Sequence, residues 1–227
     1  MKKEKLDCGI KINDKYLFFW KGPFSQWHKR PMTAADGVCY NCCEQYMMYN
    51  KALLFNDHDT ANKILYIKDP REQQKLGREV KGFDQSLWDA AKEAIVENGN
   101  YLKFSQNYDL RKLLLKTGAL LIAEASPFDS IWGIGMADDN PEIIDETKWG
   151  QNLLGKVLMK VRKRLIEHPV GCKWKDAKDD FFLTLADDLL FAYKCNITLS
   201  KKEEEELALK IAKDMNIANF SLHCLNC

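Results

Sequence analysis

The sequence predicts a predominantly helical α+β protein with a small β-sheet and a helical C-terminal extension. Three observations support this fold class. Several stretches carry helix-start signals, and a few short apolar or aromatic runs are typical of strands. Hydrophobic residues make up 46% and charged residues 30% of the 227 residues, which is the composition of a globular chain rather than a disordered one.

The N-terminal part is expected to form strands. Residues 10–12 alternate between apolar and polar side chains, Asn13 and Asp14 are turn residues, and residues 16–20 are rich in aromatic side chains. Residues 22–37, which contain two prolines and two glycines, are interpreted as an ordered loop.

Helices are expected further along the chain, and they begin near residues 44, 70, 86, 109 and 153. Asp69 is a favourable N-cap before a proline at the first helical position, and Ser86 is expected to open the next helix by the same logic. We expect that helix to end near Gly99, because glycine often follows the last residue of a helix. Asn152 is expected to cap a long final helix over residues 153–168.

Two more strands are expected between these helices. Residues 119–126 form a short apolar run, which is typical of a buried strand. Residues 131–136 are expected to form another strand, in which two glycines permit close approach of the backbone.

A domain boundary is expected at residues 169–171, which read Pro-Val-Gly. Residues 1–168 then form the main domain and residues 169–227 a helical extension. The extension carries helical patterns over residues 180–193 and 207–215. We expect it to be accessory, because the motifs described below all precede it.

Net charge and hydropathy exclude several classes of protein. The formal net charge is +1, from 34 basic and 33 acidic residues, which argues against a chain that coats nucleic acid by charge alone but leaves a local basic cleft possible. No apolar run approaches the roughly 20 residues that cross a bilayer. The N-terminal segment lacks the apolar core of a secretory signal. We therefore expect a soluble, cytoplasmic protein that does not bind membranes.

The eight cysteines raise the question of a metal site. Cys39 and Cys42 form one C-x-x-C pair, and Cys224 and Cys227 form another, so that together they offer four zinc ligands. The pairs lie at opposite ends of the sequence, and neither has the glycine of a typical zinc knuckle. We therefore expect free thiols and no metal.

The most informative segment runs from Cys43 to Phe55. At 3.6 residues per turn, one stripe of this helix carries Glu44, Met47, Met48, Lys51, Leu54 and Phe55. Because the stripe is mostly apolar it should face the interior, where a carboxylate and an amine are costly to bury. Either these two groups have a function, or both reach solvent or pair with other side chains.

This segment resembles the signature helix of the NADAR superfamily (the NAD and ADP-ribose domain). In that helix a threonine, serine or similar residue precedes Glu, an aromatic-rich stretch follows, and Lys-Ala or Lys-Phe comes next. Other stretches of the chain are similar to further motifs of the family in the same order, namely residues 24–27, 76–78, 88–89, 129–135 and 152–155. The resemblance covers about residues 17–168.

The resemblance implies an N-glycosidase that cleaves the bond between a phosphorylated or ADP-linked ribose and a base. The superfamily includes enzymes that act on early riboflavin-pathway intermediates and relatives that remove ADP-ribose from guanine. Glu44 and Lys51 would be catalytic, and the substrate would be bound by Arg78, Trp88, Asp89, Asp129, Trp132, Gly133 and Asn152. Two departures from the family pattern, Gln26 for Asn and Gln45 for His, leave the identity of the substrate open.

Each of these residues also has an ordinary structural interpretation. Asp89 sits three residues after Ser86 and could serve only its own helix, and Asn152 is a good N-cap. Trp88 and Trp132 could be core residues. Arg78 could be an ordinary surface residue. Next to a glycine at a helix end, it could also bind a phosphate bidentately.

The chemistry of N-glycoside cleavage suits these residue types. It needs stabilisation of positive charge at the anomeric carbon and protonation of the departing nitrogen. Glu44 could stabilise that charge or activate water, and Lys51 could act as a cation or attack the opened sugar as a Schiff-base nucleophile. No metal-ligand motif accompanies them, so we expect hydrolysis without a metal or cofactor.

The expected partner is a small phosphoribosyl or ADP-ribosyl substrate, with an ADP-ribosylated nucleic acid as the alternative. Two other functions stay open. One is a non-catalytic module that holds ADP-ribose or NAD. The other is an interaction protein that docks through residues 169–227.

Overall fold

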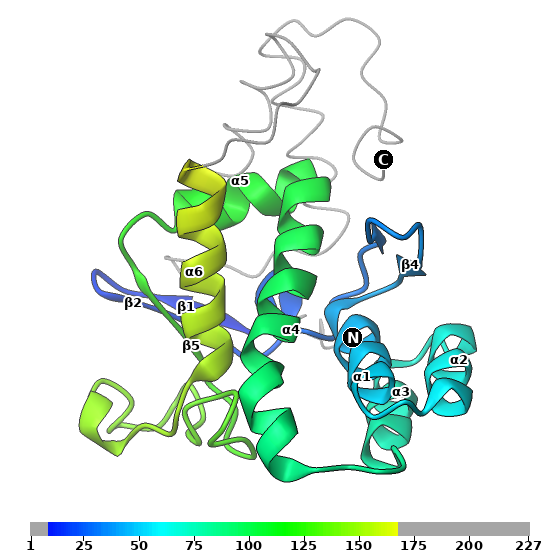
Figure 1. Cartoon of the computed structure of the whole chain (residues 1–227). Coiled ribbons are helices and arrows are strands. Elements are labelled where there is room, and N and C mark those ends of the chain that lie inside the picture. Colours follow the sequence, from blue (N-terminus) through cyan, green and yellow to red (C-terminus); the bar gives the residue numbers. More distant parts are fainter. Residues whose placement is uncertain (1–8, 168–227) are drawn as a thin grey trace, which may run out of the picture.

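The computed structural model describes residues 9–167 and has a predominantly helical α+β fold, as the sequence predicts (Figure 1). Its helices are α1 (Cys43–Leu54), α2 (His58–Tyr66), α3 (Pro70–Arg78), α4 (Gln85–Gln106), α5 (Tyr108–Lys116) and α6 (Leu153–Glu167). Its strands are β1 (Ile10–Ile12), β2 (Tyr16–Phe19), β3 (Met32–Thr33), β4 (Cys39–Tyr40) and β5 (Leu121–Glu124). The proposed extension, residues 169–227, lies outside the described residues.

The main sheet has three strands in the order β1-β2-β5. Strand β1 is antiparallel to β2, and β2 is parallel to β5, with Phe19 opposite Glu124. Because side chains alternate along a strand, Phe19 and Ile122 face the helices, whereas Phe18 and Ala123 face a second, smaller core. Glu124 follows Ile122 by two residues and therefore faces the helices.

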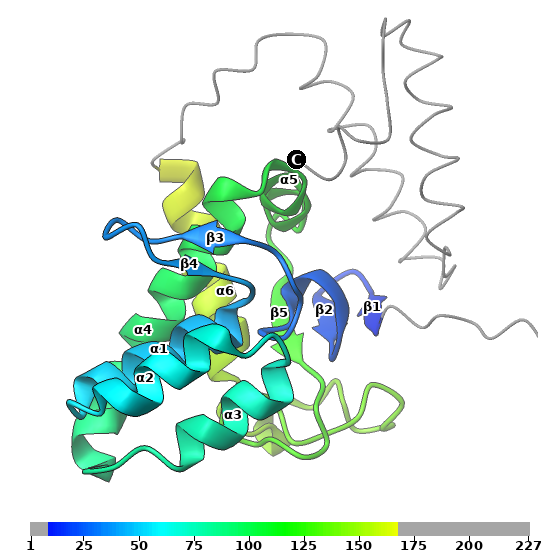
Figure 2. The same cartoon turned by 90° about the vertical axis from the view of Figure 1, so that its right-hand side faces the viewer.

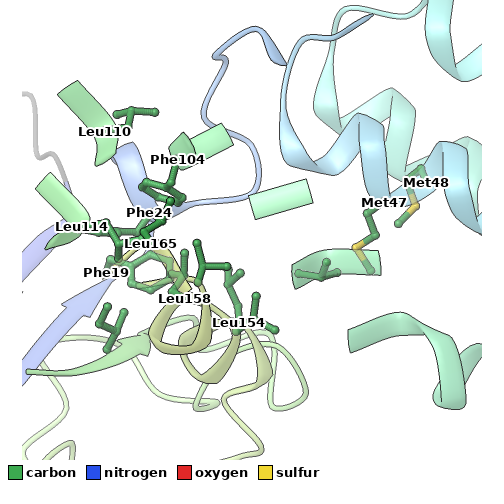
Figure 3. Packing of buried hydrophobic residues seen from close by; sticks show 14 of the residues in the cluster. Phe19, Phe24, Met47, Met48, Phe104, Leu110, Leu114, Leu154, Leu158 and Leu165 are labelled. Carbon is green, nitrogen blue, oxygen red and sulfur yellow. The ribbon is translucent and has the colours of Figure 1, made fainter. Parts of the chain in front are cut away.

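Helices α4 and α6 lie side by side and cover that face of the sheet (Figures 1 and 2). The main hydrophobic core fills the space between them and β2, where Figure 3 shows Phe19, Phe104, Leu154 and Leu158 packed together. Leu158 is fully buried, so its truncation to alanine would cost about 2–5 kcal/mol. This core fixes the position of β5 relative to the helices.

Helices α1, α2 and α3 form a second group that packs on α4 through α1 (Figure 2). Two glycines allow close packing here. Gly77 of α3 lies against the Met48 side chain, and a Cβ at Gly99 of α4 would lie 2.7 Å from the Tyr46 ring. Helix α1 is therefore held tightly between α3 and α4.

Two expectations for α4 are wrong. The N-cap is Asp84 rather than Ser86, since the Asp84 carboxylate accepts a hydrogen bond from the Leu87 backbone N–H at 2.7 Å. The helix also continues through Gly99 to Gln106, because Gly99 serves the contact with α1 and does not end the helix.

The strand expected over residues 131–136 is absent, and these residues form turns. Asp129 initiates the turns by accepting hydrogen bonds from the backbone N–H groups of Ile131 and Trp132, each at 2.8 Å. The Ile134 N–H donates to the Glu124 carbonyl at 2.9 Å without extending the sheet. Glycine in this run permits close approach to β5, as expected, but within a turn.

Other elements differ less from expectation. The strands over residues 10–12 and 16–20, the Asp69 cap of α3 and the strand within residues 119–126 are confirmed. Helix α2 and the β3–β4 hairpin were not anticipated, and the hairpin begins inside the expected loop over residues 22–37.

Within residues 9–167, no helix is long and apolar enough to cross a membrane. The same part of the chain holds no group of three or more His, Cys, Asp or Glu side chains arranged to bind a metal. Cys39, Cys42 and Cys43 are free thiols. The second C-x-x-C pair, Cys224 and Cys227, lies outside the described residues.

Candidate functional site

Glu44 occupies the first turn of α1 and is only 4% exposed. Its backbone N–H donates to the Gln26 carbonyl at 3.1 Å. Burial raises the pKa of its carboxyl to about 7. The Trp27 side chain, by hydrogen bonding, and the positive charge of Arg78 lower the pKa, and the negative charge of Asp129 raises it. Glu44 is therefore a buried carboxyl that titrates near neutral pH.

Glu124, the last residue of β5, is a half-buried residue that brings a second carboxyl to the same region. Burial raises its pKa to about 8, and the negative charges of Asp129 and Glu44 add to the effect. The charge of Asp129 acts on both Glu44 and Glu124, and the titrations of these two carboxyl groups are coupled.

Lys51 lies in the last turn of α1, two turns beyond Glu44 and about 10 Å along the helix axis. Its amine donates to the Gly77 carbonyl at 2.7 Å and lies 4.5 Å from the centre of the Phe83 ring and 5.4 Å from that of Trp88. Burial, and then the charge of Arg78, lower the pKa of this amine. Such an amine loses its proton more easily than a solvated lysine, as a nucleophile requires.

The helical stripe that carries Glu44 and Lys51 faces inward as predicted, since all six of its residues are buried or half-buried. Arg78, the last residue of α3, is exposed, and its guanidinium donates to Gln74 at 3.2 Å. Its charge lowers the pKa of both Glu44 and Lys51. A guanidinium here is accessible to a phosphate group.

Trp88 and Asp89 are neighbours in α4 with different surroundings. Trp88 is buried in the main core and contributes the ring beneath the Lys51 amine. Asp89 is exposed and accepts hydrogen bonds from Gln85 and Lys92 of its own helix. The described contacts of Asp89 are those of a helix surface, and its role in substrate binding stays a prediction.

The turn after β5 brings three predicted residues to the site. The Asp129 carboxylate is held by two backbone N–H groups and raises the pKa of both Glu44 and Glu124. A Cβ at Gly133 would lie 2.8 Å from the carbonyls of Asp129 and Glu124, so only glycine fits there. Trp132 is half-buried and packs against the main core.

Asn152 precedes α6, but its side chain does not cap that helix. Its backbone has a φ of 49°, and its amide oxygen accepts from the Glu124 N–H at 3.1 Å while its amide nitrogen donates to the Ile122 carbonyl at 3.0 Å. Both polar ends of the side chain are thus engaged by β5. Asn152 fixes the strand that carries Glu124, and a direct contact with substrate stays a prediction.

Two residues near Glu44 were not identified from the sequence. Trp27 is 38% exposed and donates to Glu44, and Glu124 faces the same region from β5. A signal existed for each. Trp27 lies within one of the motif stretches, and Glu124 is an acid within the apolar run over residues 119–126.

The two departures from the family pattern have structural partners. The Gln45 side-chain nitrogen lies 3.0–3.1 Å from the carbonyls of Ile64, Leu65 and Ile67. The Gln26 amide oxygen accepts from Asn100 at 2.8 Å. Both side chains therefore join α1 or its preceding loop to neighbouring helices.

Comparison with known proteins finds one family and several relatives that resemble this chain. The NADAR domain family matches residues 18–166. The chain is 46% identical over 163 residues to an N-glycosidase of Acanthamoeba polyphaga mimivirus, which covers 66% of this chain and 96% of that protein. It is 38% identical over 154 residues to an N-glycosidase of Nostoc punctiforme, which covers 66% and 92%. The NMR structure of Escherichia coli YbiA superposes with a TM-score of 0.58 at 25% identity, over 76% of this chain and 98% of YbiA.

Proposed function

Because the chain belongs to the NADAR domain family, we propose that it hydrolyses the N-glycosidic bond between a phosphorylated or ADP-linked ribose and a nitrogenous base. The curated N-glycosidases among its relatives support a hydrolase that acts on N-glycosidic bonds. The observation that carries the proposal is one inward-facing stripe of α1 that holds the buried Glu44 carboxyl and the half-buried Lys51 amine, with a second carboxyl, that of the half-buried Glu124, on β5.

The coupled carboxyl groups provide a proton donor and a negative charge in one place. With pKa values near 7 and 8, Glu44 and Glu124 are not both ionised at neutral pH. A protonated carboxyl can donate to the departing nitrogen, and an ionised one can stabilise positive charge at the anomeric carbon. Which of the two carries the proton at each step is a property of the pair.

Lys51 supplies the nucleophile of the proposed reaction. Its amine attacks C1 of the ring-opened sugar, and the bond from C1 to the base nitrogen breaks as that nitrogen takes a proton from a carboxyl group. Water then hydrolyses the imine between Lys51 and C1, which releases the sugar aldehyde and restores the amine. No electrons are gained or lost, so no redox partner is required.

Two further residues suit the two ends of such a substrate. The exposed Arg78 guanidinium beside the site can bind a phosphate of the ribose moiety. The Trp27 indole, which is partly exposed and hydrogen-bonded to Glu44, offers an aromatic face on which a base can stack.

The alternative function is a module that holds ADP-ribose or NAD without turnover. A reader of this kind needs Arg78 and the aromatic rings but has no use for an amine whose pKa is lowered by burial. The presence of both Glu44 and Lys51 therefore favours the enzyme.

Incubation with two substrates tests the proposal. The protein is mixed with an ADP-ribosylated guanine nucleoside or with a phosphoribosylamino-pyrimidine, and mass spectrometry follows release of the free base. We expect release from at least one substrate by the wild type and none by Glu44→Gln. Tight binding of ADP-ribose by calorimetry with no release from either substrate would favour the binding module.

A further inference from the structure

Lys103 is a completely buried lysine of α4 that the proposed chemistry does not use. Its amine donates to the Ser25 carbonyl at 2.9 Å and lies 5.0 Å from the centre of the Phe104 ring. Burying an amine costs free energy unless the amine is hydrogen-bonded. Breaking the bond from Lys103 to the Ser25 carbonyl would therefore be costly, and this bond should hold the carbonyl in one position.

Asn100 lies one turn earlier on α4 and is also completely buried. Its side-chain nitrogen donates to the Gln26 side-chain oxygen at 2.8 Å. Helix α4 therefore holds two successive loop residues, Ser25 through Lys103 and Gln26 through Asn100.

The same loop residues also contact Glu44. The Gln26 carbonyl accepts from the Glu44 backbone N–H at 3.1 Å, and the side chain of the next residue, Trp27, lies close enough to the Glu44 carboxyl to lower its pKa. A chain of contacts thus runs from the interior of α4 through three loop residues to the carboxyl at the start of α1.

We infer that Lys103 is a positioning residue, which holds the Ser25 carbonyl so that the Trp27 indole stays beside Glu44. Its part in catalysis rests on the proposed function, but the positioning itself is a property of the fold. Asn100 is the second anchor of the same segment. Lys103 would not touch the substrate, since its amine is enclosed by the protein.

Loss of this anchor has a predictable electrostatic result. A hydrogen bond from an indole favours the ionised carboxyl, so releasing Trp27 raises the pKa of Glu44. The other groups that act on this carboxyl are Arg78 of α3, Asp129 after β5 and Glu124 of β5, with the thiols of Cys42 and Cys43 beside it. None of them is removed by a substitution at Lys103.

The test uses the full chain and reads the interaction between Trp27 and Glu44 directly. The Trp27 indole N–H resonance, identified by its loss in Trp27→Phe, is followed by NMR from pH 5 to pH 9. In the wild type it should shift as Glu44 titrates. In Lys103→Met, which keeps the volume of the side chain, that pH-dependent shift should be lost or greatly reduced. An unchanged titration in Lys103→Met would overturn the inference.

A kinetic measurement extends the test to the enzyme. The limb of the kcat/KM profile that Glu44→Gln abolishes should move to higher pH in Lys103→Met, by on the order of one unit. Trp27→Phe should give the same displacement, and Lys103→Met should add nothing to it in the double variant. If the displacement persisted in the Trp27→Phe background, Lys103 would act through its charge and not through the loop.

Two further variants keep the test decisive. Lys103→Gln, with a shorter neutral donor, should give the same result in a smaller degree if Lys103→Met does not fold. Arg162→Met removes another buried cation, which donates to the Leu120 carbonyl at 3.0 Å, and should leave the Trp27 resonance unchanged. Absence of turnover would reject only the proposed function, because the indole titration needs no substrate.

Discussion

The candidate site has two halves that are built differently. The helical half consists of Glu44 and Lys51 on α1 with Arg78 at the end of α3, and its geometry follows from the regular rise and turn of a helix. The strand half consists of Glu124 on β5 and Asp129 in the turn that follows. There Glu124 is placed by hydrogen bonds to residues distant in the sequence, and Asp129 is held by a local turn.

This difference in construction predicts a difference in robustness. A helix keeps its side chains in register through many equivalent backbone bonds, so one contact can be lost with little displacement. Glu124 depends on few contacts, namely its pairing with β2, the Asn152 amide and the Ile134 N–H. We therefore expect substitutions in the helical half to lower activity mainly at the reacting groups. In the strand half, substitutions of the residues that hold Glu124 in place should lower activity as well.

The largest effects are expected at the reacting groups of the helical half. Glu44→Gln and Lys51→Ala should each lower turnover by at least about 100-fold with the fold intact, and the double variant should be little worse than either. Lys51→Arg keeps the charge but forms no imine, so it should rescue an electrostatic role and not a nucleophilic one. Borohydride added during turnover should trap a sugar adduct on Lys51. Near-normal rates in both single variants would leave the binding module as the better explanation.

A substitution in the strand half tests whether both carboxyl groups act in the reaction. Glu124→Gln should lower turnover by on the order of 10- to 100-fold and simplify the pH profile of kcat/KM, because the coupling between Glu124 and Glu44 is removed. An unchanged profile would mean that Glu44 works alone and that the strand half only shapes the site.

The pH dependence of stability should distinguish the wild type from these variants. Burial raises the pKa of Glu44 to about 7 and that of Glu124 to about 8, so the folded state holds protons that the unfolded state releases above about pH 4.5. These groups therefore cost stability progressively as the pH rises from about 5 to 8. Glu44→Gln and Glu124→Gln should each be more stable than the wild type at pH 8.5 by about 1–3 kcal/mol, and similar to it at pH 4. Urea unfolding at both pH values measures this difference, and equal stabilities at pH 8.5 would show that the carboxyl groups are better solvated than their burial implies.

The supports of the strand half are tested at Asn152. Asn152→Ala leaves the Glu124 N–H and the Ile122 carbonyl without their partner, at a cost of about 1–3 kcal/mol, and should lower turnover by displacing Glu124. Gln106→Ala is a matched control, since the Gln106 amide also bridges a strand, donating to the Thr33 carbonyl at 2.7 Å and accepting from its N–H at 2.8 Å. The control should keep full activity. Equal turnover in the two variants would remove the predicted contrast between the halves.

The smallest effect is expected at Asp89. Its carboxylate contacts Gln85 and Lys92 on the surface of α4, so Asp89→Asn should change kcat/KM by less than about twofold. Steady-state kinetics with the same substrate gives the answer. A loss of about tenfold or more, which corresponds to about 1.4 kcal/mol, would mean that the substrate extends over this face of α4.

The same division explains what could be predicted from the sequence. The helical periodicity of residues 43–55 was sufficient to predict that Glu44 and Lys51 share one inward-facing stripe. Glu124 could not be identified in this way, because its importance comes from a parallel pairing with β2 and from coupling to Asp129 and Glu44.

Two of the wrong expectations come from contacts distant along the chain, and a third comes from a local turn. Gly99 continues a helix because the Tyr46 ring packs against it, and Asn152 bonds to β5 instead of capping α6. Residues 131–136 turn back on β5 where an extended strand was expected, since Asp129 binds two successive backbone N–H groups. Local sequence patterns predicted most helices and strands, whereas the role of each polar side chain depends on how these elements pack.

The parallel pairing of β2 with β5 also has a consequence for the order of folding. It joins residues 16–19 to residues 121–124, about 100 positions apart, and β5 is held in turn by Asn152. A chain emerging from the ribosome must therefore keep its aromatic β2 segment without its parallel partner until most of the domain has been synthesised. The carboxyl group of Glu124 reaches that of Glu44 only through this pairing, so a nascent chain that has not yet reached β5 lacks the strand half of the candidate site.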